Sequence, residues 1–258
     1  MAHVEVDGLR LHYHEGGTAA GRPAVFVHGA GGNGGHWLAQ LRELPPGWRG
    51  LALDLPGHGD SEGAGCRTIA EYRDVVRAFL RGAVGTEPAA LVGHSMGGAI
   101  TQAVALAEPQ FLCAIVLVGT GARLRVHPDI LETIRRDHAG AARLVAGWAF
   151  GPAASEALRA EGIADFLRCP ATVSEGDFQA CDAFDVMAEV GRIRVPALIV
   201  CGEQDALTPP KYARYLREHI GGSRLALVLE AGHYVMRERP AAVTRALTEF
   251  LGGLPRDR

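Results

Sequence analysis

Clusters of positive charge are almost absent from this 258-residue chain. Lys211 is the only lysine among 26 basic residues, the longest basic run is Arg135-Arg136, and the formal net charge is -3. Surfaces that bind nucleic acid or anionic lipid need concentrated positive charge, which this sequence lacks. The partners that remain are small neutral or anionic molecules, and nothing in the sequence indicates an oligomeric state.

Long apolar runs and a secretory leader are also missing. The longest stretch without a formally charged side chain, Pro88 to Ala107, is interrupted by Gly93-His94-Ser95 and Gly97-Gly98. A membrane span needs about 20 mainly apolar residues. The N-terminus has neither the basic start nor the apolar core of a secretory signal. We therefore expect a cytoplasmic protein with no membrane segment.

Cysteine is sparse and forms no motif. No Cys-x-x-Cys spacing for zinc or redox chemistry occurs among the five residues Cys66, Cys113, Cys169, Cys181 and Cys201. The best-placed pair, Cys113 and Cys201, opens one expected parallel strand and closes another. Roughly 16 Å should then separate two residues that a disulfide needs within about 7 Å. We expect five free thiols.

Signals for a metal or a cofactor are missing too. His36 and His138 stand alone, without neighbouring ligand residues. The glycine-rich run from Gly29 to Gly35 contains no Gly-Lys-Ser or Gly-Lys-Thr sequence, which argues against a phosphate-binding loop. A dinucleotide-binding fingerprint is also absent. The sequence therefore predicts neither a cofactor nor a metal.

Short apolar runs and helical patterns alternate along the chain. At this length one large domain can bury roughly three quarters of its unfolded surface. A hairpin is predicted at the N-terminus, where strands at 4–6 and 9–13 flank the turn Asp7-Gly8. Further strands are predicted at 24–27, 51–53, 89–92, 113–118, 197–201 and 225–229, and helices at 69–80, 99–106, 211–220 and 241–251. This alternation predicts an α/β fold with a mostly parallel, twisted central sheet flanked by helices.

One region interrupts the alternation. Between about residues 123 and 192 the sequence predicts no strand, only helices at 128–136, 141–150, 155–159 and 178–190, with breaks that include Gly140 and Gly162. We therefore expect a helical cap at residues 122–193. It would be inserted between two parts of one core, residues 1–121 and 194–258.

The motif with the clearest chemical meaning is Gly93-His94-Ser95-Met96-Gly97-Gly98. It follows a predicted strand and precedes a predicted helix, which is the context in which Gly-x-Ser-x-Gly forms a nucleophile elbow. The glycines remove side chains that would clash in so tight a turn. Ser95 is left at the crest of the turn and is the expected nucleophile.

A serine hydroxyl needs a base, and that base needs an orienting acid. His233 follows the predicted strand at 225–229, and Asp205 follows the one at 197–201. Sites in open parallel sheets form at the carboxyl ends of strands, and the order Ser95, Asp205, His233 fits this fold. We expect His233 to be the base and Asp205 its partner, with Glu203 as the rival acid. Because the base must be neutral, activity should fall as the pH drops through roughly 6 to 7.

The oxyanion of an acyl-transfer intermediate needs two hydrogen-bond donors directed at one point. The backbone N–H of Met96 follows the nucleophile and begins a helix, so it is the first expected donor. The second is expected from the loop that runs from His28 to Gly35, directly after a strand. Ala30 is the first candidate there, and Gly31 is the next.

Together these pieces resemble the α/β-hydrolase fold family, in its serine hydrolase branch with a helical cap. The likeness is carried by five segments in the family's order: His28–Gly32, Asp54–Ser61, Gly93–Gly98, the segment around Asp205, and Gly232-His233. The resemblance is specific for the fold and weak for the substrate. It implies a chiefly structural role for Asp54 and His58, which shape their own loop.

The resemblance leaves several activities open. Haloalkane dehalogenases and epoxide hydrolases of this fold carry aspartate at the position of Ser95, and large lipases often have longer insertions or secretion signals, so these branches are disfavoured. A carboxylesterase acting on a small or medium acyl ester remains, as do a lactonase, a carbon-carbon bond hydrolase and a cofactor-free perhydrolase or haloperoxidase. A small-molecule receptor with slow turnover would use the same three residues.

Apolar side chains near these motifs are candidates for the substrate pocket. Trp37 follows the glycine-rich loop, Tyr234 and Met236 lie beside His233, and the predicted cap contributes Trp148 and Phe150. Other bulky residues at helical spacing are more readily explained as the core of the cap: Phe166, Phe178, Phe184 and Met187. The expected partners are a small acyl substrate and water.

Overall fold

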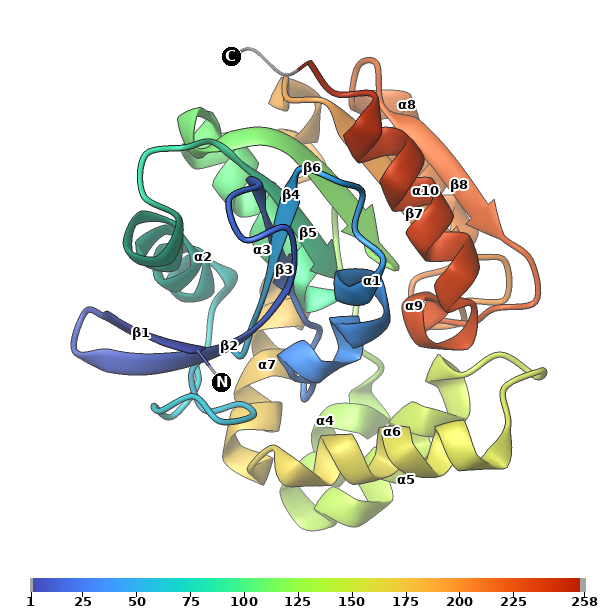
Figure 1. Cartoon of the computed structure of the whole chain (residues 1–258). Coiled ribbons are helices and arrows are strands. Elements are labelled where there is room, and N and C mark those ends of the chain that lie inside the picture. Colours follow the sequence, from blue (N-terminus) through green and yellow to red (C-terminus); the bar gives the residue numbers. More distant parts are fainter. Residues whose placement is uncertain (1, 256–258) are drawn as a thin grey trace.

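The computed structural model describes residues 2–255, which form an eight-stranded sheet flanked by helices (Figure 1). The strands are β1 (Ala2–Val6), β2 (Leu9–Gly17), β3 (Arg22–Val27), β4 (Trp48–Leu53), β5 (Ala89–His94), β6 (Leu112–Val118), β7 (Ala197–Gly202) and β8 (Arg224–Val228). They lie in the order β1-β2-β4-β3-β5-β6-β7-β8. The pairs β1-β2 and β2-β4 are antiparallel, and the remaining neighbours, from β4-β3 to β7-β8, are parallel. The predicted α/β class with a mostly parallel sheet is confirmed.

The helices are α1 (Leu38–Arg42), α2 (Ile69–Phe79), α3 (Met96–Ala107), α4 (Pro128–Arg136), α5 (His138–Ala149), α6 (Glu156–Arg168), α7 (Ala171–Ala183), α8 (Pro210–His219), α9 (Val235–Glu238) and α10 (Pro240–Gly252). Short 3₁₀ segments lie at Gly34–Trp37, Pro109–Phe111 and Val190–Arg192, and a π-helical turn at Leu80–Val84. The sequence did not predict α1 and α9, which are too short to show a helical period. Across residues 2–255, no helix has both the length and the apolar character needed to cross a bilayer.

The N-terminal hairpin turns at Asp7-Gly8, as predicted. Both residues have positive φ, 49° at Asp7 and 80° at Gly8, the conformation that a two-residue hairpin turn requires to match strand twist. Strand β2 then pairs with β4 on its other side. The hairpin therefore extends the parallel sheet by two antiparallel strands.

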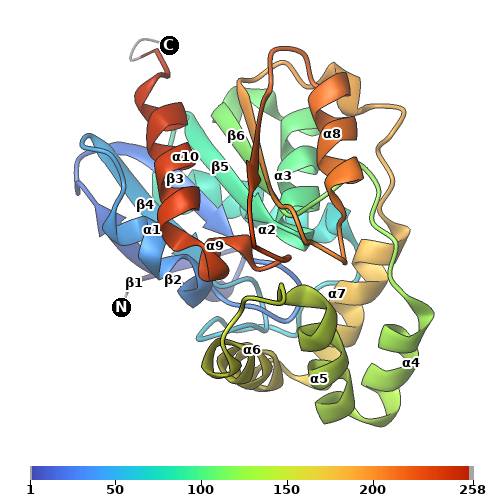
Figure 2. The ribbon, with the colours of Figure 1, turned by 90° about the vertical axis from the view of Figure 1, so that its right-hand side faces the viewer.

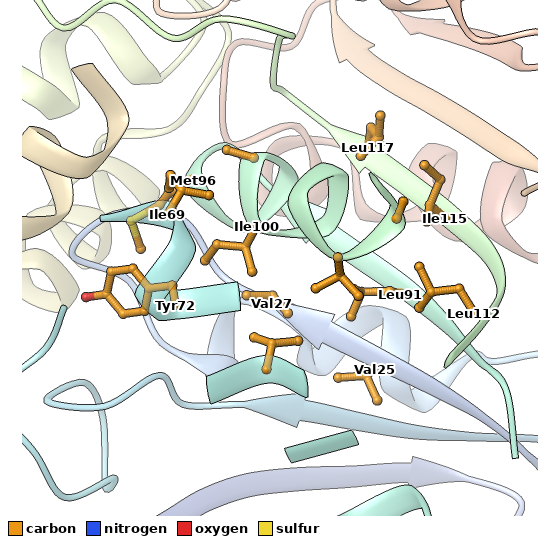
Figure 3. Packing of buried hydrophobic residues seen from close by; sticks show 14 of the residues in the cluster. Val25, Val27, Ile69, Tyr72, Leu91, Met96, Ile100, Leu112, Ile115 and Leu117 are labelled. Atoms are coloured by element: carbon orange, nitrogen blue, oxygen red, sulfur yellow. The ribbon is translucent and has the colours of Figure 1, made fainter. Parts of the chain in front are cut away.

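Alternate residues of the central strands enter two apolar cores, one on each face of the sheet. Val25 and Val27 of β3 belong to the core under α2, α3 and α8. Ala24 and Phe26 belong to the core under α1, α9 and α10. Figure 2 shows the helices on the two sides of the sheet, and Figure 3 shows the side chains packed around Val25 and Val27. Burial on both faces is the reason why these strands read as continuous apolar runs.

Residues 122–193 join β6 to β7 and carry helices α4 to α7; we call them the helical segment. In both views of the ribbon it forms a separate layer at one end of the sheet (Figures 1 and 2). Within it, α4 packs against α5 and α7, and α5 packs against α6. The segment therefore has contacts of its own among its helices.

Three details of the helical segment differ from the sequence prediction. The helix predicted at 178–190 lies instead at Ala171–Ala183, the helix predicted at 155–159 continues to Arg168, and Gly140 and Gly162 lie inside helices instead of between them. Gly162 is required by packing, since a Cβ there would lie 2.6 Å from the ring of Phe150. A glycine that serves close packing was thus mistaken for a helix break.

The five cysteines are free thiols, three of them buried and two half-buried. Burial raises the pKa of Cys66 and of Cys201 to about 12, and it holds the pKa of Cys181 well above its usual range. Thiols that stay protonated near neutral pH are weak nucleophiles. These three cysteines are therefore poor rivals to Ser95.

Candidate active site

Ser95 lies at the turn between β5 and α3, with φ 52° and ψ -114°. Residues with side chains rarely adopt this region, so the surrounding turn must hold Ser95 there. The glycines around it are needed: a Cβ on Gly93 would lie 2.1 Å from the carbonyl oxygen of Gly97, and one on Gly97 would lie 2.4 Å from that of Val27. The N–H of Ser95 donates to Val118 at 2.9 Å. The motif thus forms the sharp strand-to-helix turn that its sequence predicts.

Asp205 lies in the loop after β7 and His233 in the loop after β8, and both are buried. His233 Nδ1 lies 2.9 Å from Asp205 Oδ2. A carboxylate oxygen only accepts, so Nδ1 carries the hydrogen of this bond. The other oxygen of Asp205 accepts from the N–H groups of Leu207 and Thr208, at 2.9 and 2.8 Å. Glu203, the rival acid, is exposed.

Thr208 is part of this cluster, which the sequence analysis did not foresee. Its Oγ1 donates to Asp205 Oδ2 at 2.8 Å and lies 3.1 Å from His233 Nδ1. The hydroxyl therefore contacts both the carboxylate and the imidazole. The only sequence signal was its position three residues after Asp205, just before Pro209-Pro210, where a capping residue would also fit.

His94 supports His233 from the strand side of the site. The two ring centroids lie 4.7 Å apart, and His94 Nε2 donates to the backbone oxygen of His233 at 3.0 Å. Burial, aided by the nearby imidazole of His233, holds the pKa of His94 well below its usual range. His94 is therefore neutral at physiological pH and adds no charge beside the imidazole of His233.

A buried carboxylate on α9 fixes the loop that carries His233. Glu238 accepts from the N–H of Gly232 at 3.0 Å and from the N–H of Gly151 at 2.9 Å. The N–H of His233 itself donates to Ala149 at 2.6 Å. Because Gly151 and Ala149 belong to the helical segment, the His233 loop is held by the segment as well as by the core.

Two backbone N–H groups near Ser95 are available to a ligand. Within residues 2–255 the N–H of Ala30 donates no hydrogen bond, and Met96 is the first residue of α3, where N–H groups lack an intrahelical acceptor. The N–H of Gly31 is already bonded to Asp177, at 2.8 Å. The arrangement therefore favours Ala30 over Gly31 as the second donor.

A cavity of about 510 Å³ lies between the helical segment and the strand ends. Ser95, Ala30 and His233 all line it. Within residues 2–255 no hydrogen bond joins Ser95 Oγ to the His233 ring, a contact that often tightens only when substrate binds. Most other lining residues are apolar, with the exposed Arg125 and His127 near the rim: Leu124, Val126, Ile130, Val145, Trp148, Phe178, Leu207 and Tyr234.

The structure divides the five predicted pocket residues into two groups. Trp148 and Tyr234 line the cavity. Trp37, Phe150 and Met236 do not, which corrects the expectation for these three. Trp37 is fully buried with its ring 5.3 Å from a phenylalanine of β3, Met236 lies in the same core, and Phe150 stacks behind Tyr234 at 5.0 Å. Large apolar residues fit a core and a pocket equally well, so their positions in the sequence could not separate the two.

Within residues 2–255, two groups of residues have donor atoms close enough together to hold a metal ion: His12, His14 and Asp54, and His58, Cys169 and Asp177. Neither group lines the cavity. In each group the carboxylate is already bonded to a histidine, Asp54 to His12 at 2.7 Å and Asp177 to His58 at 2.8 Å. In each group the carboxylate and one histidine are thus engaged in a hydrogen bond of the fold itself.

Comparison with known proteins defines the class to which this fold and site belong. The model of the alpha/beta hydrolase family matches residues 24–246 of the chain. The chain therefore belongs to the alpha/beta hydrolase family, as the resemblance in the sequence predicted, and it is a hydrolase.

Individual relatives are named for different acyl chemistry. The dihydrolipoyllysine-residue acetyltransferase component of an acetoin cleaving system from Pseudomonas putida is 33% identical, over 96% of this chain and 68% of that protein. A solved thermophilic esterase has a TM-score of 0.88 and 34% identity, covering 98% of this chain and 97% of its own. The enol-lactonase of Burkholderia xenovorans LB400 has a TM-score of 0.89 and 26% identity, covering 97% and 100%.

Proposed function

We propose that this protein hydrolyses a small or medium carboxylic ester through an acyl-enzyme on Ser95, with His233 and Asp205 completing the triad. The observation that carries the proposal is that Ser95, held at positive φ, lines the same cavity as a His233 imidazole oriented by Asp205. A nucleophile and an oriented base on one cavity are the minimum for acyl transfer.

In the proposed first half-reaction, Ser95 Oγ attacks the ester carbonyl while its proton passes to His233 Nε2. The negative charge moves to the carbonyl oxygen, where the N–H groups of Ala30 and Met96 would stabilise it. The intermediate collapses, the C–O bond to the alcohol breaks, and His233 gives its proton to the leaving oxygen. Water then repeats the sequence on the acyl-enzyme, and Ser95 recovers its proton from His233.

The helical segment would act as a cap that supplies the apolar wall of the substrate site. Its residues Ile130, Val145, Trp148 and Phe178 line the cavity opposite Ser95. A cavity of about 510 Å³ has the size of a site for a small organic molecule. The apolar wall and this volume support an ester with a short or medium hydrocarbon part.

Two relatives support alternative reactions at the same residues, with a different acyl donor or a different acyl acceptor. The similarity to an enol-lactonase makes a cyclic ester the second candidate substrate. The similarity to an acetyltransferase component makes an acceptor other than water the third candidate. A receptor with slow turnover would differ from all of these in its rate, since enzymes commonly turn over at about 1 per second or faster.

A labelling experiment with a substrate panel tests the proposal. A fluorophosphonate probe should label the wild-type protein, and Ser95→Ala should abolish both labelling and hydrolysis of nitrophenyl esters. The panel should compare linear esters, lactones and ester hydrolysis in the presence of a competing alcohol. Absence of labelling of the wild type, or full ester hydrolysis by Ser95→Ala, would contradict the assignment of Ser95.

A further inference from the structure

Asp177 of α7 is fully buried and accepts hydrogen bonds from three separate parts of the core. Its Oδ2 accepts from the N–H of Gly31 at 2.8 Å and from His58 Nε2 at 2.8 Å. Its Oδ1 accepts a short hydrogen bond from the hydroxyl of Tyr72. A single carboxylate of the helical segment is therefore bonded to the glycine-rich loop, to the His58 loop and to helix α2.

The contacts of His58 show that it forms an ion pair with Asp177. His58 Nε2 faces the carboxylate, and Nδ1 faces the carbonyl oxygen of Pro56 at 3.0 Å. Both partners only accept, so both ring nitrogens carry hydrogen and the imidazole is cationic. Burial by itself would lower the pKa of His58, but the charge of Asp177 and the hydrogen bond to it outweigh burial and hold that pKa well above its usual range. Cys169 lies beside the pair.

Gly31, one of the three groups bound to Asp177, directly follows the proposed donor Ala30. The peptide unit that carries the Ala30 N–H is held through its carbonyl: Gly29 O accepts from His28 Nδ1 at 2.8 Å and from Gly32 N–H at 3.1 Å. In a planar trans peptide the N–H points away from that carbonyl. The next peptide unit, which carries the Gly31 N–H, is held by Asp177.

Only the two backbone dihedrals of Ala30 separate these peptide units, so anchors on both sides fix the direction of the Ala30 N–H. The helical segment also contacts the same loop from α6. Gly31 has φ +64°, and a Cβ there would lie 2.8 Å from the ring of Phe166. The loop is thus held by α6 through packing and by α7 through charge.

We propose that Asp177 is a positioning residue that aims the Ala30 N–H at the oxyanion, so that the oxyanion site forms only when the helical segment is seated. This inference rests on the proposed function. Asparagine at 177 would offer one acceptor oxygen to three donors and would remove the partner of the cationic His58. The Gly31 peptide would then be free to turn, and the Ala30 N–H with it.

The test compares Asp177→Asn with Tyr72→Phe, which removes a hydrogen bond from the same carboxylate without touching the glycine-rich loop. We would measure kcat and KM for a short nitrophenyl ester. We would also measure the affinity for a trifluoromethyl ketone, which Ser95 converts into an oxyanion adduct, and for the matching methyl ketone, which stays a ground-state analogue. The ratio of the two affinities separates formation of the oxyanion adduct from binding of the rest of the ligand.

Asp177→Asn should lower kcat by about 10²-fold, at the lower end of the loss seen when one oxyanion donor is removed. It should weaken trifluoromethyl ketone binding by a similar factor and leave KM and methyl ketone binding nearly unchanged. Tyr72→Phe should lower thermal stability and leave the affinity ratio unchanged. If the two variants lose stability alike and keep the wild-type ratio, Asp177 is merely structural and the inference is overturned.

A measurement on the unmodified protein covers the case in which Asp177→Asn does not fold. The amide of Gly31 lies in a loop, yet its exchange with solvent should be as slow as that of the sheet, because its acceptor is a buried carboxylate. Rapid exchange of this amide in the wild type would overturn the inference. Failure of the fluorophosphonate to label wild-type Ser95 would instead reject the proposed function, so the two failures are distinguishable.

Discussion

Two of the buried histidine-aspartate pairs within residues 2–255 have nearly equal hydrogen bonds but different surroundings. His233 and Asp205 are joined at 2.9 Å, and His58 and Asp177 at 2.8 Å. The difference lies at the second ring nitrogen. In His58 that nitrogen faces a backbone carbonyl, whereas among the described residues none offers such an acceptor to His233, which lines the cavity. The group facing the second nitrogen therefore distinguishes the two pairs: it fixes a cation at His58 and leaves His233 open to its proposed role as a base.

The largest expected difference between the pairs is in turnover. His233→Gln removes the proposed base and should lower kcat by about 10⁶-fold, as loss of a triad base does elsewhere. His58→Gln leaves the base intact and should cost far less. Steady-state kinetics on a nitrophenyl ester measure both. Similar losses in the two variants would contradict the division of roles between the pairs.

The next largest effect on turnover is expected at Asp205, the acid of the proposed catalytic pair. Asp205→Asn offers His233 an amide donor in place of an acceptor and favours the wrong tautomer, a change that costs about 10⁴-fold in kcat in a comparable triad. The control is Glu203→Gln, whose exposed side chain should leave kcat close to that of the wild type. If Glu203→Gln proves the more damaging substitution, Asp205 is the wrong acid.

The pair formed by His58 and Asp177 should contribute to the stability of the folded protein. His58→Gln leaves the buried carboxylate of Asp177 without its cation and should lower the free energy of unfolding by roughly 3 kcal/mol near pH 6.5. Urea unfolding followed by circular dichroism measures the change. A change close to zero would show that the ion pair adds nothing to the stability of the folded chain.

The pH dependence of that stability sharpens the comparison. The raised pKa of His58 means that the folded protein keeps a proton which the unfolded chain loses above about pH 6.5. The contribution of the pair is therefore complete below pH 6.5 and declines as the pH rises toward the folded pKa. Wild-type stability should fall between pH 6.5 and 8, before cysteines ionise in the unfolded chain, and His58→Gln should show a weaker fall. Equal slopes would contradict the cationic state of His58.

Below about pH 6.5, the neutral buried histidines should set most of the pH dependence of stability. Burial, aided by the charge of His58, lowers the pKa of His28 to about 3, and the pKa of His94 is also held low. Below about pH 6.5 these histidines therefore bind protons in the unfolded chain but stay neutral in the folded protein. Each of them lowers the free energy of unfolding by about 1 kcal/mol per pH unit in this range. His94→Gln should flatten this acid slope between pH 6.5 and 5, whereas the exposed control His127→Gln should leave it unchanged.

The smallest effects are expected for Trp37 and Trp148, which the sequence analysis assigned to the same pocket but which the structure places in different surroundings. Trp148→Phe trims the cavity wall and should raise KM several-fold for the longer esters that reach it, with stability nearly unchanged. Trp37→Phe removes buried surface and should lower the free energy of unfolding by about 1 to 3 kcal/mol with KM unchanged. The opposite assignment of effects would place Trp37 in the pocket after all.

The residues that the sequence identified share one property, which is a position set by local chain structure. Ser95 directly follows a strand, and Asp205 and His233 lie in the loops just after strands, so strand patterning and fold order were enough to nominate them. The structure also places Asp205 on His233 and leaves Glu203 exposed. The catalytic roles themselves stay predictions until they are measured.

The residues that the sequence missed depend on contacts between distant parts of the chain. Asp177 lies inside a helix whose boundaries were mispredicted, and nothing near it in the sequence marks it as a partner of Gly31. His58 was expected to shape its own loop, but its partner lies 119 positions away. Trp37 and Thr208 carry side chains that suit several environments. Only the folded chain distinguishes among them.

The contacts of Glu238 with Gly151 and Gly232 have a consequence for how the molecule unfolds. The helical segment is anchored to the core at two places by buried carboxylates, Glu238 near His233 and Asp177 near Gly31. Detaching the segment would deprive Asp177 of its three donors and Glu238 of the Gly151 N–H, a cost that a loosely packed lid would not have. The helical segment and the sheet should therefore unfold in one cooperative transition, although the segment is an insertion between two strands of the sheet.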